Sequence, residues 1–75
     1  MIEPDSDVPV YVQLADILRE KIRDGTYPPH RAIPSIRTLQ QEYGVADGTV
    51  QKAVQILRDE GLVHTVIGRG VFVLG

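Results

Sequence analysis

The chain of 75 residues contains no cysteine, which excludes both disulfides and thiolate metal sites. Its two histidines, His30 and His64, lie far apart in the sequence, so we expect two surface residues rather than a pair of metal ligands. The chain has only two serines and no Ser/His/Asp or paired-carboxylate spacing that would support catalysis. We therefore expect no enzyme, no metal and no bound cofactor.

Long apolar runs are also absent. No stretch of about 18 apolar residues occurs, which excludes a membrane-spanning helix. The first eight residues, MIEPDSDV, are acidic and lack the basic and apolar regions of a secretion signal, so we expect a cytoplasmic protein. We interpret residues 1–8 as an acidic flexible tail and residues 9–75 as one small domain. A domain of this size buries only ~60% of its unfolded surface, so its core is marginal.

Positive charge is scarce. The net charge is −2, which argues mildly against a nucleic-acid partner. The charge is unevenly distributed, however. Residues 1–24 hold six acidic and three basic residues, a net charge of −3, whereas residues 25–75 hold five basic and four acidic residues, a net charge of +1. This weakly basic part suits modest DNA affinity or another partner.

The first segment with helical periodicity covers residues 9–24. Pro9 suits the first turn of a helix, where its missing N–H costs nothing, and Gly25 ends the helix. Apolar residues recur on one face of this segment: Val10, Leu14, Ile17, Leu18 and Ile22. Residues 26–34 contain three prolines and cannot be helical, although Ala32 and Ile33 could form a very short strand.

Two further helices are predicted close together. A short one follows Ser35, which is a good N-cap, and ends at Gly44. Another lies within residues 45–61, where apolar residues recur at i, i+3, i+4 and i+7: Val50, Ala53, Val54 and Leu57. We predict that Asp47 caps the start of this helix and that Gly61 ends it in a left-handed conformation. Two helices joined by a short glycine-containing turn form a helix-turn-helix pattern.

After Gly61 the composition changes to β-branched residues. Two such runs, residues 62–67 and 71–74, flank the turn Gly68-Arg69-Gly70. They predict a β-hairpin with Arg69 at its tip. The complete order is helix, short strand, helix, helix, strand, strand, which is that of an α+β winged helix-turn-helix.

With this order of elements, the sequence resembles the GntR-type bacterial transcription regulators. The matching pieces occur in the family's order and spacing from Pro9 to Val73. They are Pro9-Val10-Tyr11-Val12-Gln13-Leu14, Gly25, Ile33-Pro34-Ser35, Arg37, Leu39, Tyr43-Gly44-Val45, Thr49-Val50, Ala53, Leu57, Glu60-Gly61-Leu62-Val63, Gly68-Arg69-Gly70 and Phe72-Val73. Each piece is weak alone, but together they strongly indicate this family.

The resemblance implies a sequence-specific, DNA-binding transcription regulator, and we expect a repressor. The helix in residues 45–61 would enter the major groove, and the hairpin wing would reach the minor groove. The candidate DNA-binding residues are Ser35, Arg37, Asp47, Gly48, Thr49, Gln51, Lys52, Gly68, Arg69 and Gly70. We expect a double-stranded, palindromic operator bound by a homodimer. We expect no membrane partner, and no effector-binding domain in this chain.

Several residues depart from the family's usual pattern. Ala46 and Asp47 stand where Ser or Thr followed by Arg is usual, Gln51 stands for Arg, and Ile36 for Glu. The missing arginines should lower nonspecific affinity. Gln51 could still pair with adenine, and Asp47, if it faces the groove, could accept from a cytosine amino group. An alternative is a protein-interaction module that keeps the winged-helix fold with weakened or lost DNA binding.

Overall fold

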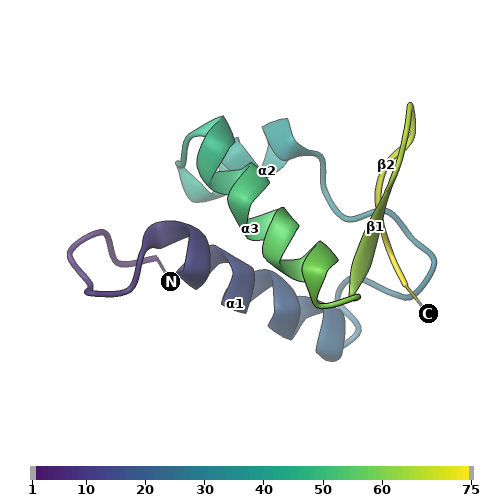
Figure 1. The fold of residues 1–75 in the computed structure, drawn as a ribbon, viewed down its shortest axis with the longest axis horizontal. Coiled ribbons are helices and arrows are strands. Elements are labelled where there is room, and N and C mark those ends of the chain that lie inside the picture. The colour runs from purple at the N-terminus through teal and green to yellow at the C-terminus, as the bar shows by residue number, and fades with distance from the viewer. Residues whose placement is uncertain (1, 75) are drawn as a thin grey trace.

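The computed structural model describes residues 2–74 and shows three helices followed by a β-hairpin (Figure 1). The elements are α1 (Val10–Arg23), α2 (Ile36–Tyr43), α3 (Asp47–Asp59), β1 (Val63–Val66) and β2 (Gly70–Val73). β1 and β2 pair antiparallel, from Val63 opposite Val73 to Val66 opposite Gly70. This architecture confirms the predicted α+β winged helix-turn-helix. Met1 and Gly75, the ends of the predicted tail and domain, lie outside the described residues.

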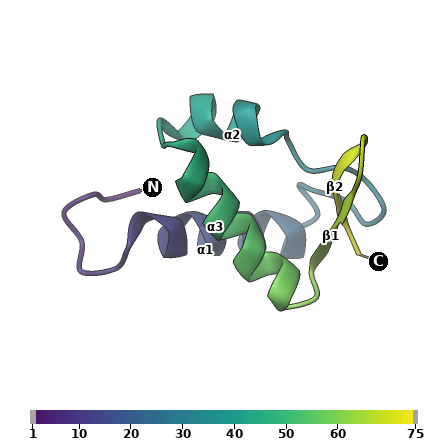
Figure 2. The same ribbon diagram turned by 45° about the horizontal axis from the view of Figure 1, so that its top comes forward.

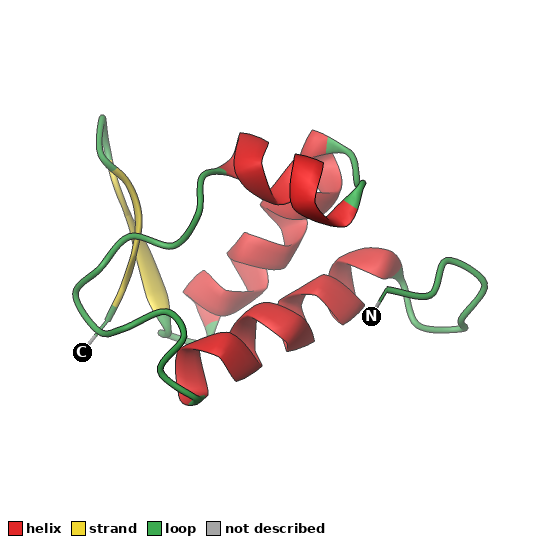
Figure 3. Ribbon diagram, turned by 180° about the vertical axis from the view of Figure 1, so that it is seen from behind, coloured by secondary structure: helices red, strands yellow, loops and turns green. Residues whose placement is uncertain are grey.

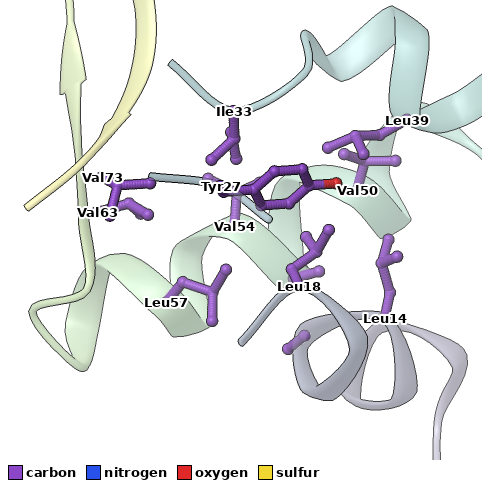
Figure 4. Packing of buried hydrophobic residues seen from close by; sticks show 12 residues of the cluster. Leu14, Leu18, Tyr27, Ile33, Leu39, Val50, Val54, Leu57, Val63 and Val73 are labelled. Atoms are coloured by element: carbon purple, nitrogen blue, oxygen red, sulfur yellow. The ribbon is translucent and has the colours of Figure 1, made fainter. Parts of the chain in front are cut away.

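α3 is the central element of the fold. It packs against α1, α2 and β1, and Figure 2 shows it crossing α1 obliquely with α2 above. The four apolar residues predicted for its inner face are all buried: Val50, Ala53, Val54 and Leu57. Leu14 and Leu18 from α1 and Leu39 from α2 meet this face (Figure 4). Complete burial of a leucine contributes about 1.5–3 kcal/mol, so these contacts fix how α3 is presented.

The segment between α1 and α2 contributes more to the core than its prolines suggest. Tyr27 is only 8% exposed, and its ring lies among the leucines and valines of the core (Figure 4). The segment then runs beside the hairpin, as seen from behind in Figure 3. Ala32 forms an isolated bridge with Phe72, and the Ile33 backbone N–H donates to the Val71 carbonyl at 2.9 Å. The predicted short strand is therefore a single bridge, and it anchors the base of the wing.

The ends of α1 and α2 follow from local chemistry. Pro9 lies just outside α1 as its N-cap, not within the first turn, and its carbonyl accepts from the Val12 and Gln13 backbone N–H groups. Ser35 caps α2 as predicted, because its Oγ accepts from the Thr38 backbone N–H at 3.1 Å. Gly44 ends α2 with φ 65° and ψ 39°, a left-handed conformation that glycine adopts without steric cost.

The prediction that Asp47 caps α3 is wrong. Ala46 occupies the N-cap position with an extended backbone, and it makes no side-chain capping hydrogen bond. The helix begins one residue early because the Ala46 carbonyl already accepts from the backbone N–H groups of Thr49 and Val50, at 3.1 and 3.2 Å. Asp47 is thus the first residue of the helix. Its carboxylate still lies near the positive end of the helix dipole, but it satisfies no helix-end N–H group.

Residues 2–8 form hydrogen bonds with α1 through the side chain of Gln13. The Gln13 Nε2 group donates to the carbonyls of Glu3 and Val8, both at 2.8 Å, and its Oε1 accepts from the Glu3 backbone N–H at 2.7 Å. Ile2 also packs against the core. Flexibility of this acidic segment stays a prediction. Within residues 2–74, no helix is long and apolar enough to cross a membrane.

Candidate nucleic-acid interface

The first turn of α3 is exposed to solvent on the outer face of the helix. Asp47, Gly48 and Gln51 are exposed, and Thr49 is half-buried. A Cβ atom placed on Gly48 would meet no atom within 4 Å, so nothing in the described protein covers this turn. The buried apolar residues on the opposite face hold the helix in place. The structure therefore brings four of the predicted site residues together on one accessible surface.

Asp47 and Gln51 lie one turn apart and interact. The Gln51 Nε2 group lies 3.3 and 3.5 Å from the two carboxylate oxygens of Asp47, at the long end of hydrogen-bonding distance. Because the amide nitrogen faces Asp47, the Gln51 carbonyl oxygen is available to accept a hydrogen bond. The pair therefore presents mainly acceptors. Amino groups of adenine and cytosine are the donors that such a surface would meet in a major groove.

The other predicted residues of the helix-turn-helix take different positions. Ser35 is used for capping, since its Oγ also donates to Thr38 Oγ1 at 2.9 Å. Arg37 is exposed in the first turn of α2. Lys52 turns towards α1, where its Nζ lies 5.3 Å from the centre of the Tyr11 ring in a cation–π contact. Of these three, Arg37 is the one with a side chain uncommitted within the described residues.

The wing tip has the shape predicted for it. Gly68 and Gly70 have φ values of 79° and 119°, which other residues rarely adopt, and the Arg69 backbone N–H donates to the Val66 carbonyl at 2.9 Å. Arg69 is exposed beyond the paired part of the hairpin. Sequence reasoning missed Ile67, which is 96% exposed beside it. The composition of the turn gave no signal that this apolar side chain would stand alone in solvent.

The outer side of the wing contains a hollow of about 420 Å³. Its lining includes both histidines, and the rings of His64 and Phe72 meet edge to face with centres 6.4 Å apart. Both histidines are exposed, as expected. Within residues 2–74, no group of three His, Cys, Asp or Glu residues is arranged to hold a metal ion.

Cations are divided sharply between the two parts of the chain. All three in residues 1–24 form ion pairs: Arg19 with Asp16 and Glu60, Lys21 with Glu42, and Arg23 with Glu20. The hydrogen bond from Arg19 holds the pKa of the Glu60 carboxyl below its ordinary value. Lys21 has its pKa raised to about 12, mainly by a hydrogen bond with Tyr43.

The five remaining cations form no ion pair within the described residues. They are Arg31, Arg37, Lys52, Arg58 and Arg69. Four of them lie on α2, α3 or the wing, and the fifth lies in the segment bridged to the wing. Within residues 2–74, unpaired positive charge therefore lies on the helix-turn-helix, on the wing and on the segment bridged to the wing. The positions of these cations favour a nucleic-acid partner more strongly than the net charge of −2 argues against one.

The fold and these exposed elements define a winged helix-turn-helix DNA-binding domain. The family model "Bacterial regulatory proteins, gntR family" matches residues 10–73, and the chain belongs to this family. It is 35% identical to the HTH-type transcriptional repressor NagR of Bacillus subtilis over 72 residues. That match covers 96% of this chain and 30% of NagR, so the chain spans less than a third of that relative.

Two solved structures extend the comparison. The DNA-binding domain of AraR in complex with operator ORR3 is 32% identical, with a TM-score of 0.86 covering 97% of this chain and 88% of that one. YtrA from Sulfolobus acidocaldarius, a GntR-family transcription factor, is 39% identical, with a TM-score of 0.89 covering all of this chain and 79% of that one. The relatives are transcription regulators, which favours that function over the protein-interaction alternative.

Proposed function

We propose that this chain binds a specific double-stranded operator and represses transcription. The observation that carries the proposal is that the cations without an ion pair among residues 2–74 lie on α2, on α3, and on the wing with its adjoining segment. Support comes from the AraR domain, which has the same fold and is bound to an operator, and from the naming of NagR as a repressor. In this proposal the chain binds DNA and catalyses no reaction. It acts in the cytoplasm, where bacterial operators lie.

In this proposal α3 enters the major groove with Asp47, Gly48, Thr49 and Gln51. Arg37 on α2 and Arg31 beside the wing are candidate phosphate contacts, while Ser35 fixes the start of α2. Lys52 would have to leave the Tyr11 ring to reach DNA, so we expect a smaller contribution from it. Gly68 and Gly70 shape the tip from which Arg69 enters the minor groove, where narrow A·T-rich stretches attract arginine.

Two copies should share one operator. A single recognition helix reads only a few base pairs, whereas two copies on a palindrome, with half-sites about one helical turn apart, read enough for a specific site. We therefore propose a homodimer on DNA. Analytical ultracentrifugation of the chain with and without operator measures this directly. One copy on every selected site would contradict it.

Selection of bound sequences from random duplexes tests the function, followed by affinity measurements at increasing salt. Each phosphate neutralised contributes about −0.9 to the slope of log K against log salt. If Arg31 and Arg37 at phosphates, Arg69 in the minor groove and, in part, Lys52 each displace counterions from DNA, the slope should be roughly −3 to −4 per copy. No binding at low salt, or a slope near zero, would show that the domain does not bind DNA.

A further inference from the structure

We propose that Arg58 sets the position of the wing relative to α3 and is not a phosphate contact. This inference rests on the proposed function, because it concerns how two DNA-reading elements are held together. Arg58 lies in the last turn of α3 and is one of the five cations that form no ion pair in the described part of the chain. Its charge alone would suggest a phosphate contact, but its hydrogen bonds point elsewhere.

The Arg58 guanidinium is held from two sides. Its Nη2 donates to the Thr65 hydroxyl on β1 at 2.7 Å, and its Nη1 donates to Gln55 Oε1 on α3 at 2.5 Å. Gln55 is itself fixed, because its Nε2 donates to the Asp59 carboxylate at 2.7 Å. The side chain thus joins the recognition helix to a strand of the wing. A planar group with several fixed donors is well suited to such a bridge.

The other anchors of the wing lie at or below the level of Thr65, and none of them reaches β1 from the outer face of α3. Val63 and Val73, at the base of the hairpin, are buried in the core, and the preceding segment pairs with β2 as far as Val71. Thr65 lies opposite Val71 in the register. Beyond that pair, the tip projects away from the C-terminal end of α3 (Figure 1).

The Arg58–Thr65 contact is distinctive within residues 2–74. No other side-chain hydrogen bond there joins α3 to the hairpin. Main-chain pairing fixes the register of the two strands, but it does not fix their inclination to the helix. A hydrogen bond from the helix to the upper part of β1 does restrict that inclination.

Thr65→Val separates the two roles of Arg58. The substitution changes no charge and keeps the β-branched shape that suits a strand, but it removes the acceptor of the Arg58 hydrogen bond. If Arg58 positions the wing, Thr65→Val should weaken operator binding about threefold to tenfold, the range expected for one coupled contact, while leaving the salt slope unchanged. Thr65→Ser keeps the hydroxyl and should bind like the unaltered chain.

Arg58→Gln completes a double-mutant cycle. Both single variants break the same bond, so Thr65→Val should add little to Arg58→Gln. In a phosphate-contact role, Arg58→Gln would instead reduce the steepness of the salt slope by about 0.9, and Thr65→Val would have no effect. Loss of A·T preference in the flanking bases should accompany Thr65→Val, since a poorly placed wing reads the minor groove less well.

Thr26→Val is the matched control. It also removes an exposed threonine hydroxyl that bonds to a neighbouring side chain, Asp24 at 2.6 Å, but it lies outside the proposed interface. Melting temperature checks that every variant folds. Unchanged affinity in Thr65→Val, or additive losses in the cycle, would overturn the inference alone. Failure of the unaltered chain to bind any selected duplex would overturn the proposed function and this inference with it.

Discussion

Replacing Asp47 should leave the stability of the domain nearly unchanged. Ala46 holds the N-cap position, so Asp47→Ala breaks no capping hydrogen bond. It removes a carboxylate from the positive end of the helix dipole, at a cost of about 0.3–1 kcal/mol. Alanine has the higher helix propensity, which offsets up to about 0.7 kcal/mol of that loss. We therefore expect a net change within about 0.5 kcal/mol, whereas loss of a true N-cap would cost about 0.5–2 kcal/mol.

The affinity for DNA, in contrast, should rise when Asp47 is replaced. The Asp47 carboxylate is exposed on the surface that we propose faces DNA, where it repels phosphates. A repulsion of about 1 kcal/mol between two unit charges in water corresponds to roughly fivefold in affinity. Asp47→Ala should therefore bind an unselected duplex about twofold to fivefold more tightly. Asp47→Arg should bind more tightly still and steepen the salt slope by about 0.9.

Thermal unfolding, monitored by circular dichroism, measures the stability of each variant. Fluorescence anisotropy with labelled duplexes measures its affinity for DNA. In a domain of this size, a loss of 1 kcal/mol lowers the melting temperature by about 4–8 °C. A fall of that size or more in Asp47→Ala would refute the assignment of Ala46 as the cap. Asp47→Asn is the matched control, because it removes the charge and keeps a polar side chain. Weaker binding of either variant to the selected operator, with unchanged melting, would show that Asp47 reads a base.

Three further changes have distinct expected outcomes. Ala46→Ser supplies the missing capping oxygen and should stabilise the domain by about 1 kcal/mol in denaturant unfolding; no gain would contradict the capping geometry. Arg69→Ala should weaken binding most on operators with A·T-rich flanks, and equal loss on all flanks would indicate a plain phosphate contact. Because Arg19 lowers the pKa of Glu60, their pair stabilises the folded state above the ordinary carboxyl pKa of 4.5 and loses this effect as pH falls below it. Glu60→Gln should reduce the loss of melting temperature between pH 6 and pH 3, and an unchanged pH profile would refute that contribution.

The elements of this fold could be predicted because their signals are local. Each signal affects only residues close to it in the sequence: the apolar spacing of α3, the serine before α2 and Gly44 after α2. The exact start of α3 could not be predicted in the same way. An alanine is a poor capping residue, and the aspartate beside it is a good one, so propensity favoured the wrong residue. The carbonyl position set by the preceding turn decided the boundary instead.

The arrangement of side chains across elements was beyond local signals. The Gln13 contacts with Glu3 and Val8 join different segments, and Arg58 finds Thr65 only after the hairpin folds back beside α3. Composition had identified Arg58 as one more positive charge in the later part of the chain. Only its surroundings distinguish a cation that holds the protein together from one that is available to a partner. The hydrogen bonds that the candidate site residues make with one another could not be predicted from the sequence, and their roles in DNA binding stay predictions.

The pairing of cations along α1 also affects how fast a complex can form. Arg19, Lys21 and Arg23 have carboxylate partners, whereas Arg37 and Arg69 have none among residues 2–74. Residues 1–24 also have a net charge of −3 and residues 25–75 one of +1, so the domain carries a charge dipole with its negative end in residues 1–24. In the field of a polyanion such a dipole turns the molecule before contact, so that more collisions begin in a productive orientation. Added salt should then act largely by slowing association, and a protein with a net charge of −2 can still find DNA quickly at low ionic strength.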